Sequence, residues 1–187
     1  FVTFTGSNEV GTLVQQAAAK NAVKCVLELG GKSPQIVFAD ADLERAVPII
    51  VKAIIQNTGQ TCTAGSRLLV QRSIYKDFLA QVARAFAAVR VGTPEMDLDC
   101  GPIINQKQKT RVLGFVDQAR SDGVALVAEG AIADGVPAGG FFVKPALFGA
   151  VPPAHPLASE EVFGPVLAVL PFEDEADAIR LAMPPSD

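Results

Sequence analysis

Two residues of this chain could perform covalent chemistry together, the thiol of Cys62 and the carboxylate of Glu28. Cys62 lies in the loop Gly59–Arg67, whose small and polar residues leave a thiol accessible and let backbone amides approach a substrate. Glu28 interrupts an apolar run and is followed at once by two glycines. A thiol nucleophile and a carboxylate base are the reactive groups that covalent acyl transfer needs. We therefore expect Cys62 to be the nucleophile and Glu28 the base, with a structural thiol and an ordinary strand-end carboxylate as the alternatives.

The surroundings of Glu28 bear on its use as a base. Leu27 and Leu29 flank it, and burial between apolar side chains would raise the pKa of the carboxyl toward the range useful for proton transfer. The single histidine, His155, lies in a proline-rich loop. We expect it to be solvated there rather than paired with Cys62, so the base for the thiol is more plausibly a carboxylate.

The composition excludes several other classes of protein. The chain has 187 residues, is 49% hydrophobic and 19% charged, and carries a formal net charge of -4, which favours a globular domain without nucleic-acid or membrane partners. No apolar run approaches the roughly 20 residues that span a bilayer. One histidine and three cysteines without ligand-like spacing predict no metal site and a reducing, cytoplasmic setting. Cys25, in an apolar run, and Cys100, beside acidic residues, are poorer nucleophiles than Cys62.

Alternating apolar patterns predict the elements that must position these groups. Strands are expected at residues 1–5, 23–29, 36–38, 67–71, 125–128, 141–147 and 166–171. Helices are expected at residues 8–20, 42–56, 74–89 and 106–120, and from about residue 174 onward. Asp42 can cap the second helix, and residues 130–140 read as a glycine-rich surface loop. The alternation of strands and helices indicates an α/β fold with a mostly parallel sheet flanked by helices.

Two further segments could bind a ligand. In Thr5–Gly11 a strand feeds a Gly-Ser turn and a helix start, where backbone amides bind phosphate well. It lacks the G-x-G-x-x-G dinucleotide pattern, so Ser7 as a plain helix cap is the alternative. Near the carboxyl end, Glu161 could accept hydrogen bonds from ribose hydroxyls and Phe163 could pack on a flat ring. The alternative there is a charged loop with Phe163 anchored in the core.

Together these segments resemble the aldehyde dehydrogenase superfamily. Phe4–Gly11 resembles its cofactor-binding turn, Leu27–Pro34 its glutamate motif, Gly59–Arg67 its cysteine motif and Glu161–Pro165 its late cofactor motif. The order and spacing of the four motifs agree, and the resemblance covers nearly the whole chain. It implies the aldehyde dehydrogenase fold and NAD(P)-dependent oxidation of an aldehyde to a carboxylic acid.

The resemblance also implies a role for each motif residue. Cys62 would form a thiohemiacetal with the aldehyde and, after hydride passes to NAD or NADP, hold the thioester, while its backbone amide stabilises the oxyanion. Glu28 would activate the water that hydrolyses the thioester. Contacts to the cofactor would come from Gly6, Ser7, Gly11, Leu29, Gly30, Glu161 and Phe163, and more weakly from Gln108 and Arg111. Of these, Glu161 would hold the nicotinamide ribose and Phe163 would border the nicotinamide.

The resemblance further implies an incomplete chain. Residues 1–29 would be the last piece of a dinucleotide-binding domain, and residues 30–187 a catalytic domain truncated at its carboxyl end. The family's second oxyanion donor would lie upstream of this sequence, so we expect little turnover from the isolated chain. The parent protein would be a homo-oligomer with a small aldehyde as substrate. A CoA-acylating dehydrogenase, disfavoured by Glu28, and a non-catalytic binding or assembly module, disfavoured by Cys62 with Glu28, remain alternatives, and the aldehyde and the choice of NAD or NADP stay open.

Overall fold

The computed structural model describes residues 1–183 and divides the chain into two compact units. Unit 1 is Phe1–Gly31, and unit 2 begins at Lys32. The boundary expected from the sequence lay between residues 29 and 30, close to this division. Which domain of a larger protein each unit represents stays a prediction. No helix of residues 1–183 is both long and apolar enough to cross a membrane.

Unit 1 is a single strand–helix–strand motif. The strands β1 (Val2–Thr5) and β2 (Cys25–Glu28) pair in parallel, and α1 (Asn8–Lys20) connects them. Residues 21–24 form the turn that leaves the helix, with Ala22 at a positive φ of 52°, so β2 is shorter than the strand predicted at 23–29. This arrangement brings the carboxyl ends of both strands to the start of α1.

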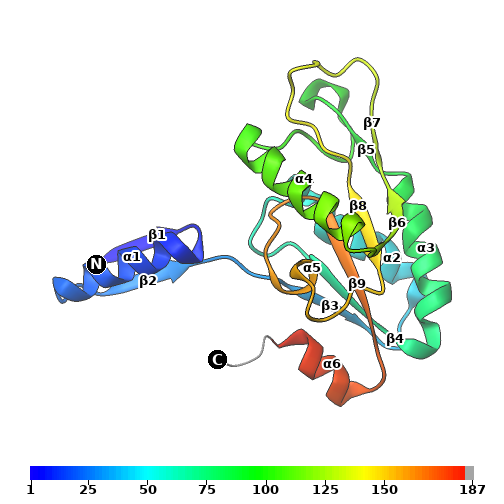
Figure 1. The fold of residues 1–187 in the computed structure, drawn as a ribbon, viewed down its shortest axis with the longest axis horizontal. Helices are drawn as coiled ribbons and strands as arrows, with labels where there is room; N and C mark the ends of the chain where they lie inside the picture. Colours follow the sequence, from blue (N-terminus) through cyan, green and yellow to red (C-terminus); the bar gives the residue numbers. More distant parts are fainter. Residues whose placement is uncertain (184–187) are drawn as a thin grey trace. The chain divides into compact units, whose positions relative to one another are not determined.

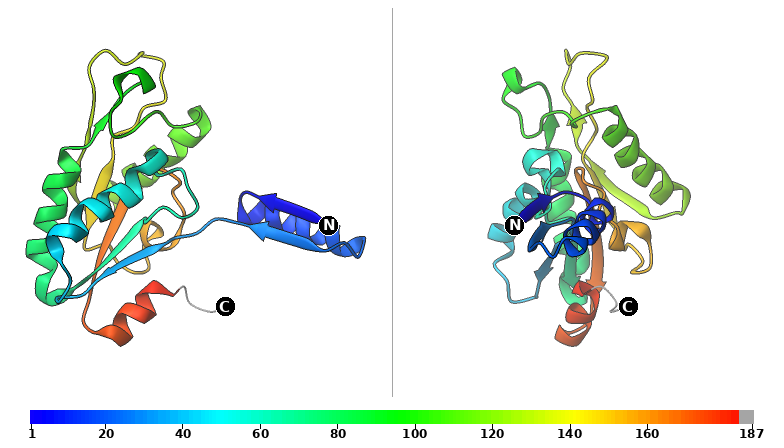
Figure 2. Two further views of the ribbon diagram at one scale, coloured as in Figure 1. Left: turned by 180° about the vertical axis from the view of Figure 1, so that it is seen from behind. Right: turned by 90° about the vertical axis from the view of Figure 1, so that its left-hand side faces the viewer.

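Unit 2 is built on a five-stranded sheet with the order β3-β4-β9-β8-β6 in the described part of the chain (Figures 1 and 2). The strands are β3 (Pro34–Val37), β4 (Arg67–Gln71), β9 (Val166–Phe172), β8 (Ala146–Gly149) and β6 (Ala125–Glu129). Neighbours pair in parallel except for β6, which is antiparallel to β8. The mostly parallel α/β sheet predicted from the sequence is confirmed.

Helices cover both faces of this sheet. Figure 1 shows α2 (Leu43–Ile55) and α3 (Tyr75–Ala87) on one face, and α4 (Gln106–Ser121) with the short α5 (Pro156–Ser159) on the other. The side chain of Asp42 caps α2 by accepting a hydrogen bond from Arg45 N, as predicted. The two sides of the sheet therefore form two separate apolar layers.

Successive side chains of the central strands enter alternate layers. On β4, Leu68 and Val70 pack in the layer of α2 and α3, whereas Leu69 packs in the layer of α4. On β9, Leu167 packs in the same layer as Leu68, and Ala168 packs in the same layer as Leu69. All five side chains are buried, as expected for parallel strands covered on both faces.

Several short elements were not predicted. They are the strands β5 (Arg90–Val91) and β7 (Ala131–Ile132) and the 3-10 turns η1 (Gln56–Gly59), η2 (Arg72–Ile74) and η3 (Pro94–Met96). The pair β5–β7 is parallel, and β7 lies inside the segment that the sequence suggested was only a surface loop. Each is shorter than the window over which hydrophobic periodicity can be recognised.

The strand predicted at residues 141–147 is wrong over most of its length. The structure places β8 at Ala146–Gly149, and residues 141–145 lie outside any strand. Pro145 has no N–H to donate to a ladder. Phe141 instead accepts a hydrogen bond on its carbonyl oxygen from Ile103 N, at 2.8 Å, so this segment contacts the chain leading into α4.

The prediction that His155 is a solvated loop residue is also wrong. The side chain of His155 is only 9% exposed and caps α5, with Nδ1 accepting a hydrogen bond from Leu157 N at 3.0 Å. Because Nδ1 accepts, a neutral ring carries its proton on Nε2, which lies 3.3 Å from a carboxylate oxygen of Asp122. His155 therefore belongs to the scaffold of unit 2.

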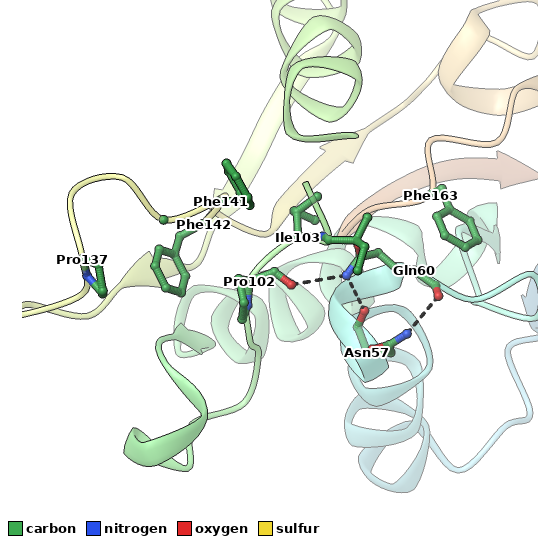
Figure 3. Close-up of a pocket in the computed structure, with 10 residues that line it drawn as sticks. Asn57, Gln60, Pro102, Ile103, Pro137, Phe141, Phe142 and Phe163 are labelled. Atoms are coloured by element: carbon green, nitrogen blue, oxygen red, sulfur yellow. Dashed lines mark hydrogen bonds between the residues drawn. The ribbon is translucent and has the colours of Figure 1, made fainter. Parts of the chain in front are cut away.

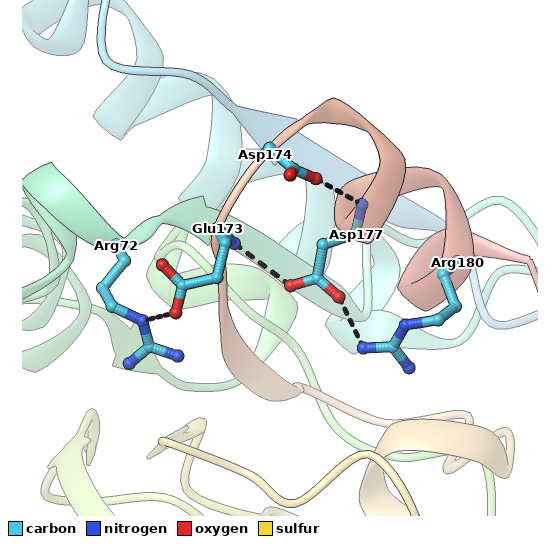
Figure 4. A network of polar contacts seen from close by, with 5 residues as sticks. All are labelled: Arg72, Glu173, Asp174, Asp177 and Arg180. Carbon is cyan, nitrogen blue, oxygen red and sulfur yellow. Dashed lines mark hydrogen bonds and ion pairs between the residues drawn. The ribbon is translucent and has the colours of Figure 1, made fainter.

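The last helix, α6 (Glu175–Ala182), begins as predicted at Asp174 (Figure 4). The carboxylate of Asp174 accepts a hydrogen bond from Asp177 N at 2.9 Å, and that of Asp177 accepts one from Glu173 N at 3.1 Å. Ion pairs join Arg180 to Asp177 and Arg72 to Glu173. These contacts fix the turn between β9 and α6 on the surface of the unit.

Candidate active site

Three motif loops of unit 2 lead into the amino-terminal ends of neighbouring parallel strands. The Cys62 loop enters β4 at Arg67, and the Glu161–Pro165 loop enters β9. The register pairs Pro34 with Arg67 and Arg67 with Ala168, so the starts of β3, β4 and β9 lie at one edge of the sheet. Most open α/β sheets bind ligands at the opposite, carboxyl edge. Topology alone thus gathers Lys32, Cys62 and Glu161 around one edge.

The loop that carries Cys62 turns sharply before the cysteine. Asn57 and Thr58 have left-handed backbones with φ of 48° and 56°, and Gly59 follows at 71°. Thr58 is buried and its hydroxyl donates a hydrogen bond to Gly101 O at 3.0 Å. Cys62 itself is exposed and carries a free thiol. A rigid turn is therefore followed by an accessible thiol.

Gln60 ties this loop to the segment that precedes α4. Its carboxamide nitrogen donates to Asn57 O at 3.1 Å and to Pro102 O at 3.4 Å (Figure 3). Its carboxamide oxygen accepts from Ile104 N at 2.8 Å. Sequence reasoning gave Gln60 no role. A polar side chain next to a candidate nucleophile is a signal, but its partners far along the chain cannot be deduced without the fold.

The residues after Cys62 are equally well held. Gly65 N donates to Ala53 O at 3.0 Å, and Gly65 O accepts from the carboxamide of Gln35 at 2.9 Å. A side chain on Gly65 would collide with Gln35. The cysteine thus lies on a short exposed stretch between two fixed anchors, which limits the entropy lost on positioning the thiol.

Arg67 joins three parts of this edge. It is 8% exposed, and its guanidinium donates hydrogen bonds to Lys32 O at 2.8 Å, Leu181 O at 2.7 Å and Ala182 O at 2.7 Å. Burial lowers the pKa of Arg67 from its usual value. The side chain caps the carboxyl end of α6 while holding the start of β3, and sequence reasoning missed it because its acceptors are backbone carbonyls.

The Glu161–Pro165 loop is held by two side chains of α4. Gln108 donates from its carboxamide nitrogen to Val162 O at 3.0 Å and to Phe163 O at 2.8 Å, and Arg111 donates to Glu161 O at 2.7 Å. The expectation for Gln108 and Arg111 was a weak contact with the cofactor. Their hydrogen bonds in this structure go to the backbone of the loop that carries Glu161 and Phe163.

A cavity of about 560 Å³ opens beside this loop. Its wall is mostly apolar and aromatic, with Phe141, Phe142 and Phe163 among the lining residues, and Asn57 and Gln60 supply polar edges (Figure 3). Phe163 is half-buried on this wall rather than anchored in the core. The cavity therefore suits a flat group with a few polar substituents.

Lys32 places a cation close to the same loop. Its Nζ has no exposed surface and makes no hydrogen bond within residues 1–183. Burial and, to a smaller extent, the charge of Arg67 lower the pKa of Lys32 to about 8, while Glu161 and Glu160 act in the opposite direction. Burial at this position therefore disfavours the charged form of the Lys32 side chain.

In unit 1 the expected cofactor residues gather at the start of α1. Ser7 caps this helix, and its hydroxyl accepts a hydrogen bond from Val10 N at 3.3 Å. Gly11 is buried, and a side chain there would collide with Leu29. Ser7 thus acts as the cap that was considered as an alternative, while Gly11 and Leu29 let helix and strand pack closely.

The other residues of this group surround Glu28. Gly6 N donates to Glu28 O at 3.1 Å, and Gly30 N donates to the side-chain oxygen of Asn8 at 3.1 Å. Glu28 ends β2 with an exposed side chain, so the burial between Leu27 and Leu29 does not occur in this structure. The structure places Glu28 and Cys62 in different units.

The remaining cysteines differ from Cys62. Cys25 is half-buried, whereas Cys100 is buried and its thiol contacts Ile55 O at 3.6 Å. Burial, with a smaller contribution from Asp99, raises the pKa of Cys100 to about 12. Within residues 1–183, no group of three or more histidine, cysteine or acidic side chains could hold a metal ion.

The exposed thiol of Cys62 thus lies on a loop fixed at both ends, two residues after Gln60, which lines the aromatic cavity. The chain belongs to the aldehyde dehydrogenase family, whose model matches residues 1–183. Members of this family use NAD or NADP.

Known relatives are similar over almost the whole of this chain. A crystal structure of a candidate aldehyde dehydrogenase from Burkholderia cenocepacia is 54% identical, with a TM-score of 0.95 over 96% of this chain and 38% of that one. The Mycobacterium tuberculosis aldehyde dehydrogenase solved with NAD+ is 41% identical, with a TM-score of 0.91 over 96% and 37%. Betaine aldehyde dehydrogenase of Cereibacter sphaeroides is 42% identical over 182 residues, 97% of this chain and 37% of that protein. The chain thus spans less than two fifths of these relatives, 37–38% of their length.

Proposed function

We propose that this chain carries the reactive centre of an NAD(P)-dependent aldehyde dehydrogenase, with Cys62 as nucleophile and Glu28 as base. The observation that carries the proposal is the exposed thiol of Cys62 on a loop fixed at both ends, next to the Glu161–Pro165 loop at the same sheet edge. The two other cysteines are half-buried and buried. We also propose a reducing, cytoplasmic setting, because Cys62 must stay a free thiol to act.

Residues of this chain fit the nicotinamide end of the cofactor. Phe163 lines a largely apolar cavity of about 560 Å³, which suits a flat ring, and the carboxylate of the half-buried residue Glu161 suits ribose hydroxyls. The amino terminus of α1, capped by Ser7, presents backbone N–H groups of the kind that bind phosphate. When bound, NAD(P)+ accepts the hydride that leaves the aldehyde carbon.

Cys62 would act first. Its thiolate attacks the aldehyde carbon, forming a C–S bond and pushing the carbonyl electrons onto oxygen as an alkoxide. The backbone N–H of Cys62 donates a hydrogen bond to that oxygen and stabilises its charge. Loss of hydride leaves an acyl group bound to Sγ as a thioester.

Glu28 would complete the cycle. Its carboxylate removes a proton from water as the water oxygen attacks the thioester carbon, and the C–S bond then breaks to return the thiolate. The products are a carboxylic acid and the reduced cofactor. A CoA-acylating enzyme would release the thioester to CoA instead and would not need a base at position 28.

A hybrid enzyme tests this assignment. The matching segment of the Burkholderia cenocepacia protein, which is 54% identical, is replaced by this chain, and aldehyde-dependent NAD(P)H formation is followed. Cys62→Ala should abolish it, whereas Glu28→Gln should leave one equivalent of NAD(P)H per site followed by almost no turnover. Steady turnover of Glu28→Gln on adding CoA would favour the CoA-acylating alternative, and turnover of Cys62→Ala would refute the proposal.

The isolated chain provides the second test. Because it spans 37–38% of its relatives' length, we expect it to oxidise short aldehydes slowly or not at all with NAD+ or NADP+. Robust turnover by the purified chain would show that these residues suffice and would overturn this expectation.

A further inference from the structure

Phe163 holds a backbone conformation that phenylalanine disfavours. Its φ is 57°, in the left-handed region where the side chain crowds the backbone. Such residues persist only where the surroundings fix them, and they concentrate at sites of function. Contacts around Phe163 must therefore hold this backbone conformation in place.

The clearest restraint is the carboxamide of Gln108. Its nitrogen donates to the carbonyls on both sides of the Phe163 α-carbon, to Val162 O at 3.0 Å and to Phe163 O at 2.8 Å. Two acceptors on one donor group fix the orientation of both peptide planes and hence the φ and ψ of the residue between them. Gln108 is itself fixed, because its backbone N donates to the capping side chain of Asn105 at 2.9 Å.

The loop cannot relax on its other side. A side chain on Gly164 would overlap Val112 of α4, and a side chain on Gly59 would overlap Gly164 O. The segment that follows Phe163 is therefore closely packed between α4 and the loop that carries Cys62. Gln108 and these contacts hold the backbone at Phe163, and the Phe163 ring lies on the wall of the cavity.

Building on the proposed function, we propose that Gln108 is a positioning residue that holds the Phe163 ring against the nicotinamide, through the backbone and without touching the cofactor. This differs from the direct cofactor contact expected from the sequence. If Gln108 acts only by positioning the Phe163 ring, its substitution should change cofactor binding only when residue 163 carries that ring.

A double-mutant cycle separates positioning from contact. In the hybrid enzyme, Gln108→Leu removes the donor at similar volume. Gln106→Leu on the same helix is the control, since the carboxamide of Gln106 donates to Thr110 within the same helix. We expect Gln108→Leu to raise the KM for cofactor about tenfold and Gln106→Leu less than twofold. In a Phe163→Leu background, Gln108→Leu should have almost no further effect. Additive effects of the two substitutions would mean direct contact and would overturn the proposal.

Two further measurements guard against a simple folding defect and against failure of the proposed function. Hydrolysis of p-nitrophenyl acetate by Cys62 needs no cofactor and should be unchanged in Gln108→Leu; an equal loss there would indicate general damage and refute positioning. Crystal structures of the full chain and of its Gln108→Leu variant need no activity. Phe163 should leave the left-handed region in the variant, and a φ that stays near 57° would overturn the proposal even if the hybrid oxidised no aldehyde.

Discussion

Gly59 and Gly164 touch through their backbones, so that a methyl group on Gly59 would overlap the carbonyl oxygen of Gly164. Gly59 ends the turn before Cys62, and Gly164 follows Phe163. The contact joins the loop of the proposed nucleophile to the loop of the proposed nicotinamide wall. Gly59 also has a φ of 71°. Both this left-handed backbone and the close approach to Gly164 therefore require a residue without a side chain.

Substitution of Gly59 should therefore be costly. We expect Gly59→Ala to lower the free energy of unfolding by about 2–4 kcal/mol, from overpacking and from the left-handed backbone. Tyr75, the single tyrosine of a chain without tryptophan, reports unfolding of unit 2 in urea. Gly114→Ala is the control, because that helical glycine has nothing within 4 Å of an added Cβ and should stabilise by about 0.5–1 kcal/mol. Equal effects at the two sites would contradict the contact.

Removal of the Arg67 side chain should destabilise unit 2 strongly. Arg67→Ala leaves three carbonyls, of Lys32, Leu181 and Ala182, without their donor, and we expect a loss of about 2–4 kcal/mol in urea unfolding. Arg72→Ala, which breaks an exposed ion pair with Glu173, should cost less than about 1 kcal/mol. A smaller loss for Arg67→Ala than for Arg72→Ala would show that α6 is not held by this side chain.

Thiol labelling should rank the three cysteines. At pH 8 a thiol with a pKa of about 12 is ionised to only about one part in ten thousand, so buried Cys100 should resist iodoacetamide. Exposed Cys62 should react first and half-buried Cys25 more slowly, as read by peptide mass spectrometry. Labelling of Cys25 before Cys62 would contradict the assignment of Cys62 as the accessible nucleophile.

The stability of the chain should depend on pH through Lys32. Its pKa is lowered from 10.5 to about 8, so between these values the unfolded chain holds a proton that the folded chain has released. Raising the pH through this range therefore makes the contribution of Lys32 to stability more favourable, by up to about 1.4 kcal/mol per pH unit. Cys100, with its raised pKa, acts in the opposite direction above pH 9.0, and this term cancels when the parent is compared with a Lys32 variant. Below pH 8 the cost of burying the charged ammonium is fully present and constant.

A substitution isolates this effect. The free energy of unfolding is measured by circular dichroism for the parent and for Lys32→Met. The difference, parent minus variant, should rise by about 2 kcal/mol between pH 8 and pH 10. Lys107→Met, at an exposed position of α4, should show no such change relative to the parent. If the difference in unfolding free energy between the parent and Lys32→Met did not change with pH, the Lys32 ammonium would be solvated in the folded chain.

The sequence was most informative where local chemistry decides the structure. Capping side chains such as Asp42 and Asp174 mark helix starts, and the apolar stripe of α3 runs through its whole length, so these elements were predicted correctly. The loop containing Cys62 was recognisable because glycine, threonine and serine are unusual neighbours for a core cysteine. In each case the signal lies within one or two turns of chain.

The rest depended on partners far along the chain. Gln108 and Arg67 donate to backbone carbonyls, which any residue supplies, so no pattern in the sequence points to their acceptors. His155 looked solvated because the prolines around it suggest a loop, and Asp122 comes beside it only in the folded unit. Similarly, the apolar residues 141–145 read as a strand, although Pro145 prevents a regular ladder.

The central position of β9 has a consequence for synthesis. This strand pairs with β4 on one side and β8 on the other, yet it is the last in sequence of the five described strands of this sheet. Until it emerges, β4 and β8 present unpaired edges that other chains could capture. The edge that collects the Cys62 and Glu161 loops therefore closes only after nearly all of unit 2 has been made, and nascent chains of this protein should depend on chaperones until that moment.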